Sequence, residues 1–239
     1  MIGGDPVYGS LFCQLYNDFG WNEYPRALGR RILTWLDGHG LRPARALDLG
    51  CGTGMLCAVL TAGGVAADGL DLSPDMIDVA KTNYPGLAFT VGDMTDFTVE
   101  HRYDLVTCTG DALNHIFDPD AVGRAFACVR RALNDGGVFL FDLLDPDEVP
   151  AGEPFEAEHS DGTRVRFETV TDGRDVRLTI KTYEGDALKF EENILERVHD
   201  LGDILARLER AGFEVVQCTN RLLDTDGSGT TRFIAARAI

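Results

Sequence analysis

The 239-residue sequence predicts a doubly wound α/β fold, in which helices cover both faces of a largely parallel sheet. Two observations lead to this prediction. Short apolar segments of strand length alternate with segments of helical period between residues 23 and 144. In addition, three glycines, Gly50, Gly52 and Gly54, follow the first apolar segment directly, where such a fold turns from strand to helix.

The first half of this alternation carries clear helix and strand signals. A helix is predicted over 23–40 and another over 55–64, each closed by glycines. Ser73 followed by Pro74 is typical of a helix N-terminus and predicts a third helix that runs to about Asn83. Buried strands are predicted between these helices, at 45–50, 66–73 and 87–93.

The second half contains further elements of the same kind and then a different pattern. Asp118 and Pro119 repeat the helix start, and this helix is predicted to end at 134–136. From about Pro150, apolar and polar residues alternate between glycine-containing turns, which predicts an antiparallel meander inserted into the parallel sheet or laid over it. The remaining predictions are strands at 103–110 and 137–144, a helix at 201–212, and strands at 213–220 and 230–239.

The alternation within the meander predicts two different faces. One face is buried and carries Val165, Phe167, Val176, Leu178 and Ile180. The opposite face carries Arg164, Arg166, Arg177 and Lys181. These basic residues are interpreted as a solvated face, with the grip of an anionic acceptor as the alternative.

Composition excludes several classes of protein. Lysine and arginine number 22 against 39 aspartates and glutamates, a formal charge of −17, which opposes binding to nucleic acid or an anionic membrane. No apolar run approaches the roughly 18 residues of a membrane span, and the N-terminus lacks a signal-peptide pattern. The six cysteines show no paired spacing, as expected in a reducing compartment. We therefore expect a cytoplasmic protein without a metal site.

The glycine cluster has the spacing G-x-G-x-G and is followed by well-placed acids. A dinucleotide fingerprint would require glycine at Met55, and the Gly-Lys-Ser/Thr of a phosphate loop is absent. Asp48 precedes the cluster, and Asp93 ends the third strand. Asp71 ends the second strand about 20 residues later, where a carboxylate can accept both hydroxyls of a ribose. The loop is therefore interpreted as a backbone that a ligand without pyrophosphate approaches closely.

Five segments resemble, in order, the motifs of class I S-adenosylmethionine-dependent methyltransferases: ALDLGCGTG, GLDLSPDMIDVAK, VGDMTDF, YDLVTCTGDALNHI and RALNDGGVFLFDLL. The resemblance covers roughly 44–145 and 200–239 and implies a Rossmann-like seven-stranded sheet with an antiparallel last strand. The inserted sheet and YGSLFCQLYNDFG resemble a narrower group, the small bacterial methyltransferases of small molecules, including amino-sugar N-methyltransferases. The implied reaction transfers a methyl group to a small acceptor, at nitrogen or oxygen, and leaves S-adenosylhomocysteine.

The same resemblance implies a role for each matched position. The glycine loop would lie against the methionine part of the cofactor, Asp48 would steady the loop and the amino group, and Asp71 would hold the ribose. Asp93 and the backbone of Met94 would contact adenine. The whole implied cofactor-binding set is Tyr16, Asp48, Gly50, Cys51, Gly52, Gly54, Asp71, Leu72, Met76, Asp93, Met94, Thr109 and Gly110.

Two residues are candidates for the base that removes a proton from the acceptor. Asp111 and His115 are four residues apart and would share one face of a helix. A helix cap or a cofactor contact is the alternative for Asp111, and capping or packing is the alternative for His115. His159 and His199 are weaker candidates.

The N-terminal segment is rich in aromatic residues, and it is interpreted as a lid with Tyr16 over the cofactor. The alternative is that these rings only fasten the terminus to the core. The predicted organisation is a helical cap or lid at 1–40, a core at 41–149 and 200–239, and an inserted sheet at 150–199 that covers the acceptor site. The aromatic residues are Tyr8, Phe12, Tyr16, Phe19, Trp21 and Tyr24.

Other functions remain open at this stage. The chain could bind S-adenosylmethionine without turnover, methylate protein or RNA, or use a nicotinamide cofactor on the same type of sheet. The charge opposes RNA, and Met55 opposes the nicotinamide enzyme. We expect a small-molecule acceptor, no nucleic acid or membrane partner, and a monomer or homodimer. The sequence does not identify the acceptor or the atom that is methylated.

Overall fold

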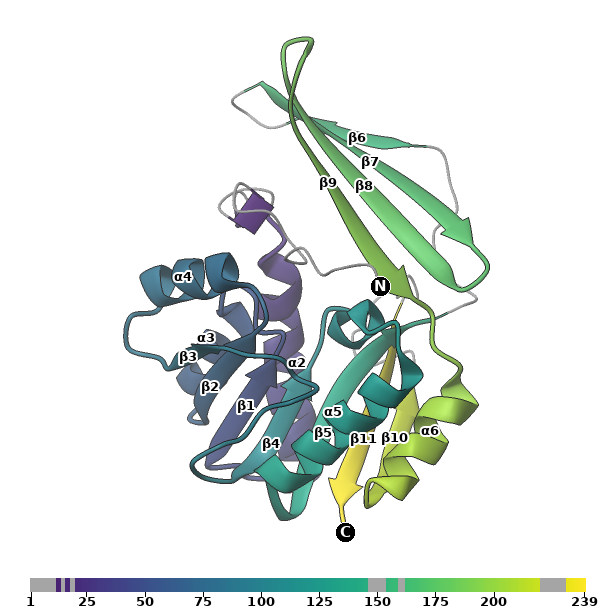
Figure 1. Cartoon of the computed structure of the whole chain (residues 1–239). Helices are drawn as coiled ribbons and strands as arrows, with labels where there is room; N and C mark the ends of the chain where they lie inside the picture. The colour runs from purple at the N-terminus through teal and green to yellow at the C-terminus, as the bar shows by residue number, and fades with distance from the viewer. Residues whose placement is uncertain (1–11, 14–15, 18–19, 146–153, 159–161, 220–230) are drawn as a thin grey trace.

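The computed structural model describes residues 12–13, 16–17, 20–145, 154–158, 162–219 and 231–239. In this part of the chain the strands form two separate sheets, and helices lie on both faces of the larger one (Figure 1). The predicted doubly wound α/β fold is therefore confirmed. Tyr8, Phe19 and His159, which the sequence analysis names, lie outside the described residues.

The larger sheet contains seven strands among the described residues, in the order β10-β11-β5-β4-β1-β2-β3. Strands β1 to β5 are parallel, and β11 runs antiparallel to both β5 and β10, as predicted. The strands are β1 (Arg45–Leu49), β2 (Ala66–Asp71), β3 (Phe89–Val91), β4 (Tyr103–Cys108), β5 (Leu133–Leu144), β10 (Phe213–Thr219) and β11 (Thr231–Ala238).

The helices divide into two groups because each packs its apolar side on one face of this sheet. α5 and α6 contribute Phe126, Val129 and Leu208 to the hydrophobic core on one face. α2, α3 and α4 contribute residues such as Ile32 and Leu60 to the core on the other face. The bounds are α2 (Glu23–Gly38), α3 (Met55–Ala62), α4 (Pro74–Asn83), α5 (Pro119–Ala132) and α6 (Leu201–Arg210), with a short 3-10 helix η1 at Ala112–His115.

The predicted helix starts are confirmed, but one predicted helix end is wrong. The Ser73 side chain caps α4 by accepting a hydrogen bond from the backbone N–H of Met76, and Asp118 caps α5 in the same manner. The helix predicted to end at 134–136 ends earlier, at Ala132. The reason is that the next residue already pairs with Tyr103 of β4 and begins β5.

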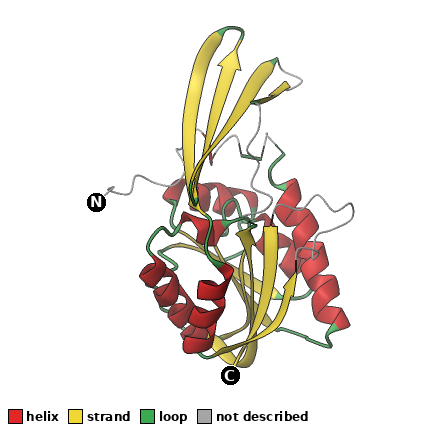
Figure 2. Cartoon of the chain, turned by 90° about the vertical axis from the view of Figure 1, so that its right-hand side faces the viewer, coloured by secondary structure: helices red, strands yellow, loops and turns green. Residues whose placement is uncertain are grey.

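The segment after β5 folds into a second sheet, an antiparallel meander that we call the insert sheet. Figures 1 and 2 show it standing apart from the main sheet, at the carboxyl end of β5, so it is not inserted among the parallel strands. Hairpin turns at Gly173 and Gly185 connect its long strands, where the sequence predicts turns. Its strands are β6 (Phe155–Glu158), β7 (Thr163–Asp172), β8 (Asp175–Glu184) and β9 (Ala187–Arg197).

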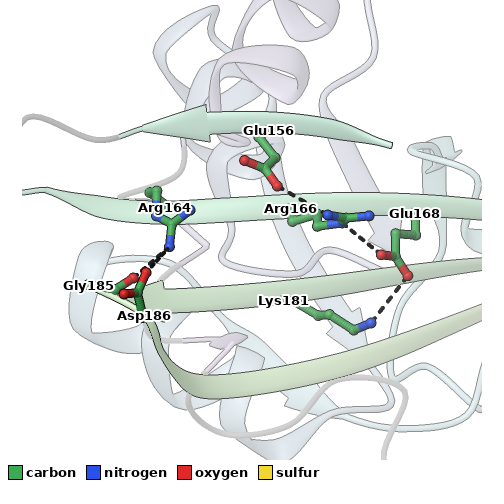
Figure 3. Close-up of polar contacts among 7 residues, drawn as sticks. All are labelled: Glu156, Arg164, Arg166, Glu168, Lys181, Gly185 and Asp186. Carbon is green, nitrogen blue, oxygen red and sulfur yellow. Dashed lines mark hydrogen bonds and ion pairs between the residues drawn. The ribbon is translucent and has the colours of Figure 1, made fainter. Parts of the chain in front are cut away.

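The two predicted faces of the insert sheet are confirmed by its register. Phe167 pairs with Ile180, and Arg166 pairs with Lys181, so apolar and basic residues lie on opposite sides. On the basic side, Arg166 forms ion pairs with Glu156 and Glu168, and Glu168 also pairs with Lys181 (Figure 3). The basic residues therefore meet glutamates of their own sheet, which agrees with a solvated face.

The apolar side of the insert sheet packs against the N-terminal segment. Phe12 is fully buried, and its ring lies 4.8 Å from Trp21 and 6.3 Å from Phe190 of β9, centroid to centroid. Trp21 in turn contacts Phe167 of β7. Among the described residues no helix is long and apolar enough to cross a membrane. All six cysteines are free thiols.

Candidate functional site

A cavity lies at the carboxyl ends of β1, β2 and β4, on the side of the main sheet where the insert sheet stands. Ligands of doubly wound folds bind at this edge because the loops that leave parallel strands converge there. Twelve of the thirteen residues predicted to bind the cofactor line this cavity, and Gly54 is the exception. The twelve are Tyr16, Asp48, Gly50, Cys51, Gly52, Asp71, Leu72, Met76, Asp93, Met94, Thr109 and Gly110.

The glycine loop presents bare backbone to this cavity. Gly52 has a φ of +51°, and a Cβ placed on it would have no atom within 4 Å, so its open side faces the cavity. Gly54 has a different reason to be glycine. It precedes α3 with a φ of +85°, and a Cβ there would lie 2.6 Å from the ring of Phe89. The absence of a side chain at Gly52 therefore leaves the cavity open, whereas at Gly54 it lets the Phe89 ring pack behind the loop.

Asp71 at the end of β2 ties the glycine loop to the start of α4. Its two carboxylate oxygens accept hydrogen bonds from the backbone N–H groups of Gly52, at 2.8 Å, and Ser73, at 2.9 Å. Burial raises the pKa of this carboxyl, and the backbone donors oppose that rise. Each carboxylate oxygen keeps accepting capacity beyond the one bond it makes, so Asp71 can also accept from a ligand in the cavity.

Asp48 in β1 is enclosed more completely than the other acids of the loop region. Its side chain accepts a hydrogen bond of 2.7 Å from the hydroxyl of Thr107, which pairs with it across β1 and β4. Burial raises its pKa to about 7, and the charges of Asp71 and Asp142 add to this rise. Its direct partner is thus β4 and not the glycine loop, although Asp48 also lines the cavity.

Asp93 and Met94 lie in the turn after β3 and bound the cavity on that side. The Asp93 carboxylate accepts a hydrogen bond of 2.7 Å from the backbone N–H of Thr95, and the side chain is exposed. Met94 packs against Cys108 and the core of the main sheet. This part of the wall offers one carboxylate beside an apolar surface, an arrangement that suits a flat ring with a donor group.

A second acidic region, around Asp142 of β5, lies behind the cavity wall at Tyr24 and Gly110, and its acids do not themselves line the cavity. The Asp142 carboxylate accepts hydrogen bonds from the backbone N–H groups of Gly110 and Asp111, both at 3.0 Å, and from the hydroxyl of Tyr24 at 3.1 Å. Burial raises the pKa of Asp142 to about 6. Burial and the charges of Asp142 and Glu196 raise the pKa of Asp111 well above its usual value.

His115 lies in the cavity wall between this acidic region and the insert sheet. Its Nδ1 is 3.0 Å from the carbonyl oxygen of Leu195, which can only accept, so Nδ1 carries the proton. The other nitrogen, Nε2, lies 3.9 Å from the carboxylate of Glu196. Burial lowers the pKa of His115, which keeps the ring neutral and leaves Nε2 as a proton acceptor.

The geometry of Asp111 and His115 differs from the shared helical face expected from their spacing. Asp111 precedes η1 in a left-handed conformation, with a φ of +61°, and η1 spans only four residues. His115 lines the cavity and Asp111 does not, but the two belong to one acidic region because each interacts with Glu196. His199 does not line this cavity, and its Nε2 donates a hydrogen bond of 3.2 Å to the carbonyl oxygen of Leu113.

Two acids of this region, Asp142 and Glu196, are absent from the predicted set. Asp142 has a sequence signal, since it is a charged residue within the apolar run GVFLFDLL. Glu196 has a weaker one, because strand alternation puts it on the same face as the apolar Ile194. Asn114 was also missed, although it is fully buried and joins the two sheets through hydrogen bonds to Leu144 and Arg197.

In a comparison with protein families, residues 46–137 match the family described as "Methyltransferase domain". A curated relative is a dTDP-3-amino-3,6-dideoxy-alpha-D-glucopyranose N,N-dimethyltransferase of Streptomyces fradiae, 30% identical over 168 residues. That alignment covers 69% of this chain but only 61% of the relative's length. A putative methyltransferase of Bacillus subtilis is 24% identical, with 85% of this chain and 87% of the relative covered.

Solved structures resemble the chain over nearly its whole length. The CcbJ methyltransferase of Streptomyces caelestis has a TM-score of 0.82 at 19% identity, with 98% of both chains covered. CalS10, an amino pentose methyltransferase of Micromonospora echinaspora solved with S-adenosylmethionine bound, has a TM-score of 0.77 at 22% identity, with 99% of this chain and 100% of the other covered. At such identities the likeness concerns the fold, including the insert sheet.

Proposed function

We propose, from the match of residues 46–137 to the methyltransferase family, that the chain transfers a methyl group from S-adenosylmethionine to an amine nitrogen of a small, sugar-like acceptor. One observation carries the proposal. A single cavity extends from bare loop backbone and a ribose-type carboxylate to His115, and a cluster of acids lies directly behind that part of its wall. The name of the Streptomyces fradiae relative supports nitrogen and a sugar as the target.

The residues present fit this cofactor. Its methionine part needs close approach to backbone, which Gly52 permits because no side chain occupies that position. Its ribose needs an acceptor, which the Asp71 carboxylate provides, and its adenine would lie near Asp93 and Met94. The cofactor is positively charged and carries no phosphate, so carboxylates suit it better than lysine or arginine.

When bound, S-adenosylmethionine supplies a methyl group that is already activated by its positively charged sulfur. The chain's part is then to position an acceptor and to manage its proton. Tyr16 and Tyr24 bound the cavity from the N-terminal side and help to exclude water. Nε2 of His115 and the carboxylate of Asp111 are the groups proposed to hold or receive a proton at the acceptor nitrogen.

We expect the N-terminal segment to act as the lid over this site and the insert sheet as its other wall. Tyr16 lines the cavity, and Asn17 accepts a hydrogen bond of 3.0 Å from the hydroxyl of Thr53 in the glycine loop. Glu196 belongs to β9 of the insert sheet and meets His115 at the cavity wall. These contacts support a cap at 1–40 and an acceptor-covering insert at 150–199 over the core at 41–149 and 200–239.

The proposal is tested by binding and by turnover. Isothermal titration calorimetry is expected to show binding of S-adenosylmethionine and S-adenosylhomocysteine, and no binding of NAD. Incubation with S-adenosylmethionine and a dTDP-linked 3-amino sugar is expected to add one or two methyl groups, detected by mass spectrometry. The matched dTDP-linked 3-hydroxy sugar is expected to stay unmodified. Binding of NAD without S-adenosylmethionine would contradict the proposed function.

A further inference from the structure

Three carboxyl groups from three different elements lie together behind the part of the cavity wall formed by Tyr24, Gly110 and His115. Asp142 comes from β5, Asp111 from the start of η1, and Glu196 from β9 of the insert sheet. Each is linked to the cavity wall. Asp142 accepts hydrogen bonds from Tyr24 and Gly110, and Glu196 lies 3.9 Å from His115.

These carboxylates lack the cations that usually accompany buried acids. No salt bridge of the described residues joins Asp111, Asp142 or Glu196 to a lysine or arginine. His115 is a basic group beside Glu196, and burial lowers its pKa. Removing several like charges from water without a counter-charge is unfavourable by several kcal/mol per ion. The arrangement therefore favours a positively charged group that comes from outside the chain.

Asp111 supplies an independent sign that a ligand is missing. Its Oδ1 is buried, and among the residues that the structure describes no group donates a hydrogen bond to it. Asp111 is also the only described residue other than glycine with a positive φ, a conformation held by the hydrogen bond from its backbone N–H to Asp142. Asp142 thus positions Asp111, and Asp111 keeps one oxygen available for a donor.

The spacing of the cluster does not suit a metal ion. Among the described residues no group of three or more His, Cys, Asp or Glu side chains could hold one. The open oxygen of Asp111 calls for a hydrogen-bond donor, which a bare metal ion is not. An ammonium group has three N–H donors and carries the required charge.

We propose that Asp111 and Glu196, with Asp142 as the positioning residue, form a subsite for the ammonium group of the acceptor, and that Asp111 receives its proton. This inference rests on the proposed function. An N–H bond of the acceptor breaks, its electron pair remains on nitrogen as the lone pair, and the proton bonds to Oδ1 of Asp111. A carboxylate and an ammonium group thereby become a carboxylic acid and a neutral amine, which is nucleophilic.

The test uses two small probes of the same shape, cyclohexylammonium and the neutral cyclohexanol, on the full chain saturated with S-adenosylhomocysteine. Calorimetry is expected to show at least about tenfold tighter binding of cyclohexylammonium, as one charge-assisted hydrogen bond provides. Titrations in phosphate and in Tris buffer are expected to show proton release on binding, because a cation favours the ionised form of Asp111, Asp142 and Glu196.

Two variants and one control decide which residues hold the probe. Asp111→Asn and Glu196→Gln are each expected to weaken cyclohexylammonium binding at least about tenfold and to reduce proton release. Glu191→Gln is the control, since Glu191 lies on the same strand as Glu196 but on the opposite, exposed face, and it is expected to leave both quantities unchanged. Circular dichroism and urea unfolding report whether each variant keeps its fold.

Several results would overturn the inference. Equal affinity for the two probes, or no binding of either, excludes an ammonium subsite. Loss of S-adenosylhomocysteine affinity in parallel with loss of the probe would assign the cluster to the amino group of the cofactor. If S-adenosylhomocysteine does not bind at all, the proposed function fails, and the same probe comparison on the free chain tests the ammonium subsite separately.

Discussion

Asp48 is a carboxylic acid enclosed in the centre of the main sheet, and its protonation is linked to folding. Its pKa rises to about 7, from an ordinary value of 3.8. Between these two values the folded chain binds a proton at Asp48 that the unfolded chain has lost. Stability therefore falls as pH rises through this window, by up to about 1.4 kcal/mol per pH unit for one proton.

Asp48→Asn is expected to remove this contribution, because the amide stays neutral and its oxygen can still accept from Thr107. Urea unfolding at pH 5, 6, 7 and 8 should show the variant gaining stability relative to the original chain as pH rises to about 7. The charges of Asp71 and Asp142 act on Asp48, so the difference between the two chains measures Asp48 together with its coupling to these two acids. Asp78→Asn, at an exposed position on α4, is the control and should give a parallel curve. A parallel curve for Asp48→Asn would refute the linkage.

In the loop between β1 and α3, two glycines have different structural roles. Gly52→Ala is expected to cost about 1–2 kcal/mol of stability through its left-handed backbone alone. Gly54→Ala is expected to cost more, because its Cβ would also clash with Phe89. Gly64→Ala is the matched control for strain, since Gly64 has a φ of +91° and open space around it, on the far side of α3.

The affinity for S-adenosylhomocysteine is expected to distinguish Gly52→Ala from Gly64→Ala. If the loop holds the cofactor, Gly52→Ala should weaken S-adenosylhomocysteine at least about tenfold, because a methyl group would enter the space that the ligand needs. Gly64→Ala should lose similar stability and keep the affinity. Calorimetry and urea unfolding on the same samples check both quantities. Equal affinities for Gly52→Ala and Gly64→Ala would show that the ligand does not approach Gly52.

The contact between the insert sheet and the N-terminal segment gives the next prediction. Phe190 stacks against the fully buried Phe12, and Tyr16 on the same segment lines the cavity. Phe190→Ala is expected to raise hydrogen exchange in β7 to β9 and around Phe12, and to leave β1 and β4 unchanged. Phe155→Ala removes the same type of side chain from a position that is 64% exposed, and it should change little. Faster exchange throughout the main sheet would show that the insert sheet does not open independently of the main sheet.

The elements that the sequence predicts well are those with local causes. Ser73 and Asp118 cap their helices where expected, and the turns at Gly173 and Gly185 connect hairpins, because capping and turn formation depend on neighbours in sequence. The separation of the insert sheet from the main sheet was left open, since it depends on which strand edges pair. The end of α5 also depends on strand pairing, because the residue that follows this helix pairs with β4.

Some residues of the candidate site can likewise be predicted from the sequence, and others cannot. Acids that end neighbouring parallel strands, such as Asp71, can be predicted to meet, because those strand ends share one edge of the sheet. Glu196 was not predicted, because its place beside His115 depends on how two separate sheets pack. The predicted resemblance to methyltransferases is confirmed by the family match over residues 46–137, whereas the roles of the individual site residues remain predictions.

At the scale of the whole molecule, the net charge of −17 and the acidic region behind the cavity wall act in the same direction. An acidic surface attracts a cationic acceptor before contact, and salt screens this attraction with a Debye length of about 8–10 Å at physiological ionic strength. The same charge repels nucleic acid, so we expect no RNA binding even at low salt. A small cationic amine is therefore the acceptor that the field of the protein favours.

This field predicts a salt dependence that differs between acceptors. For an amine acceptor, kcat/KM should fall about two- to fivefold when NaCl rises from about 20 mM to about 300 mM, because long-range attraction is lost. Methylation of an uncharged acceptor, or binding of neutral cyclohexanol, should hardly change over the same range and serves as the control. Glu191→Gln alters the net charge by only one unit and should keep the slope. A salt dependence that is equal for charged and uncharged ligands would show that the negative field does not guide the acceptor to the site.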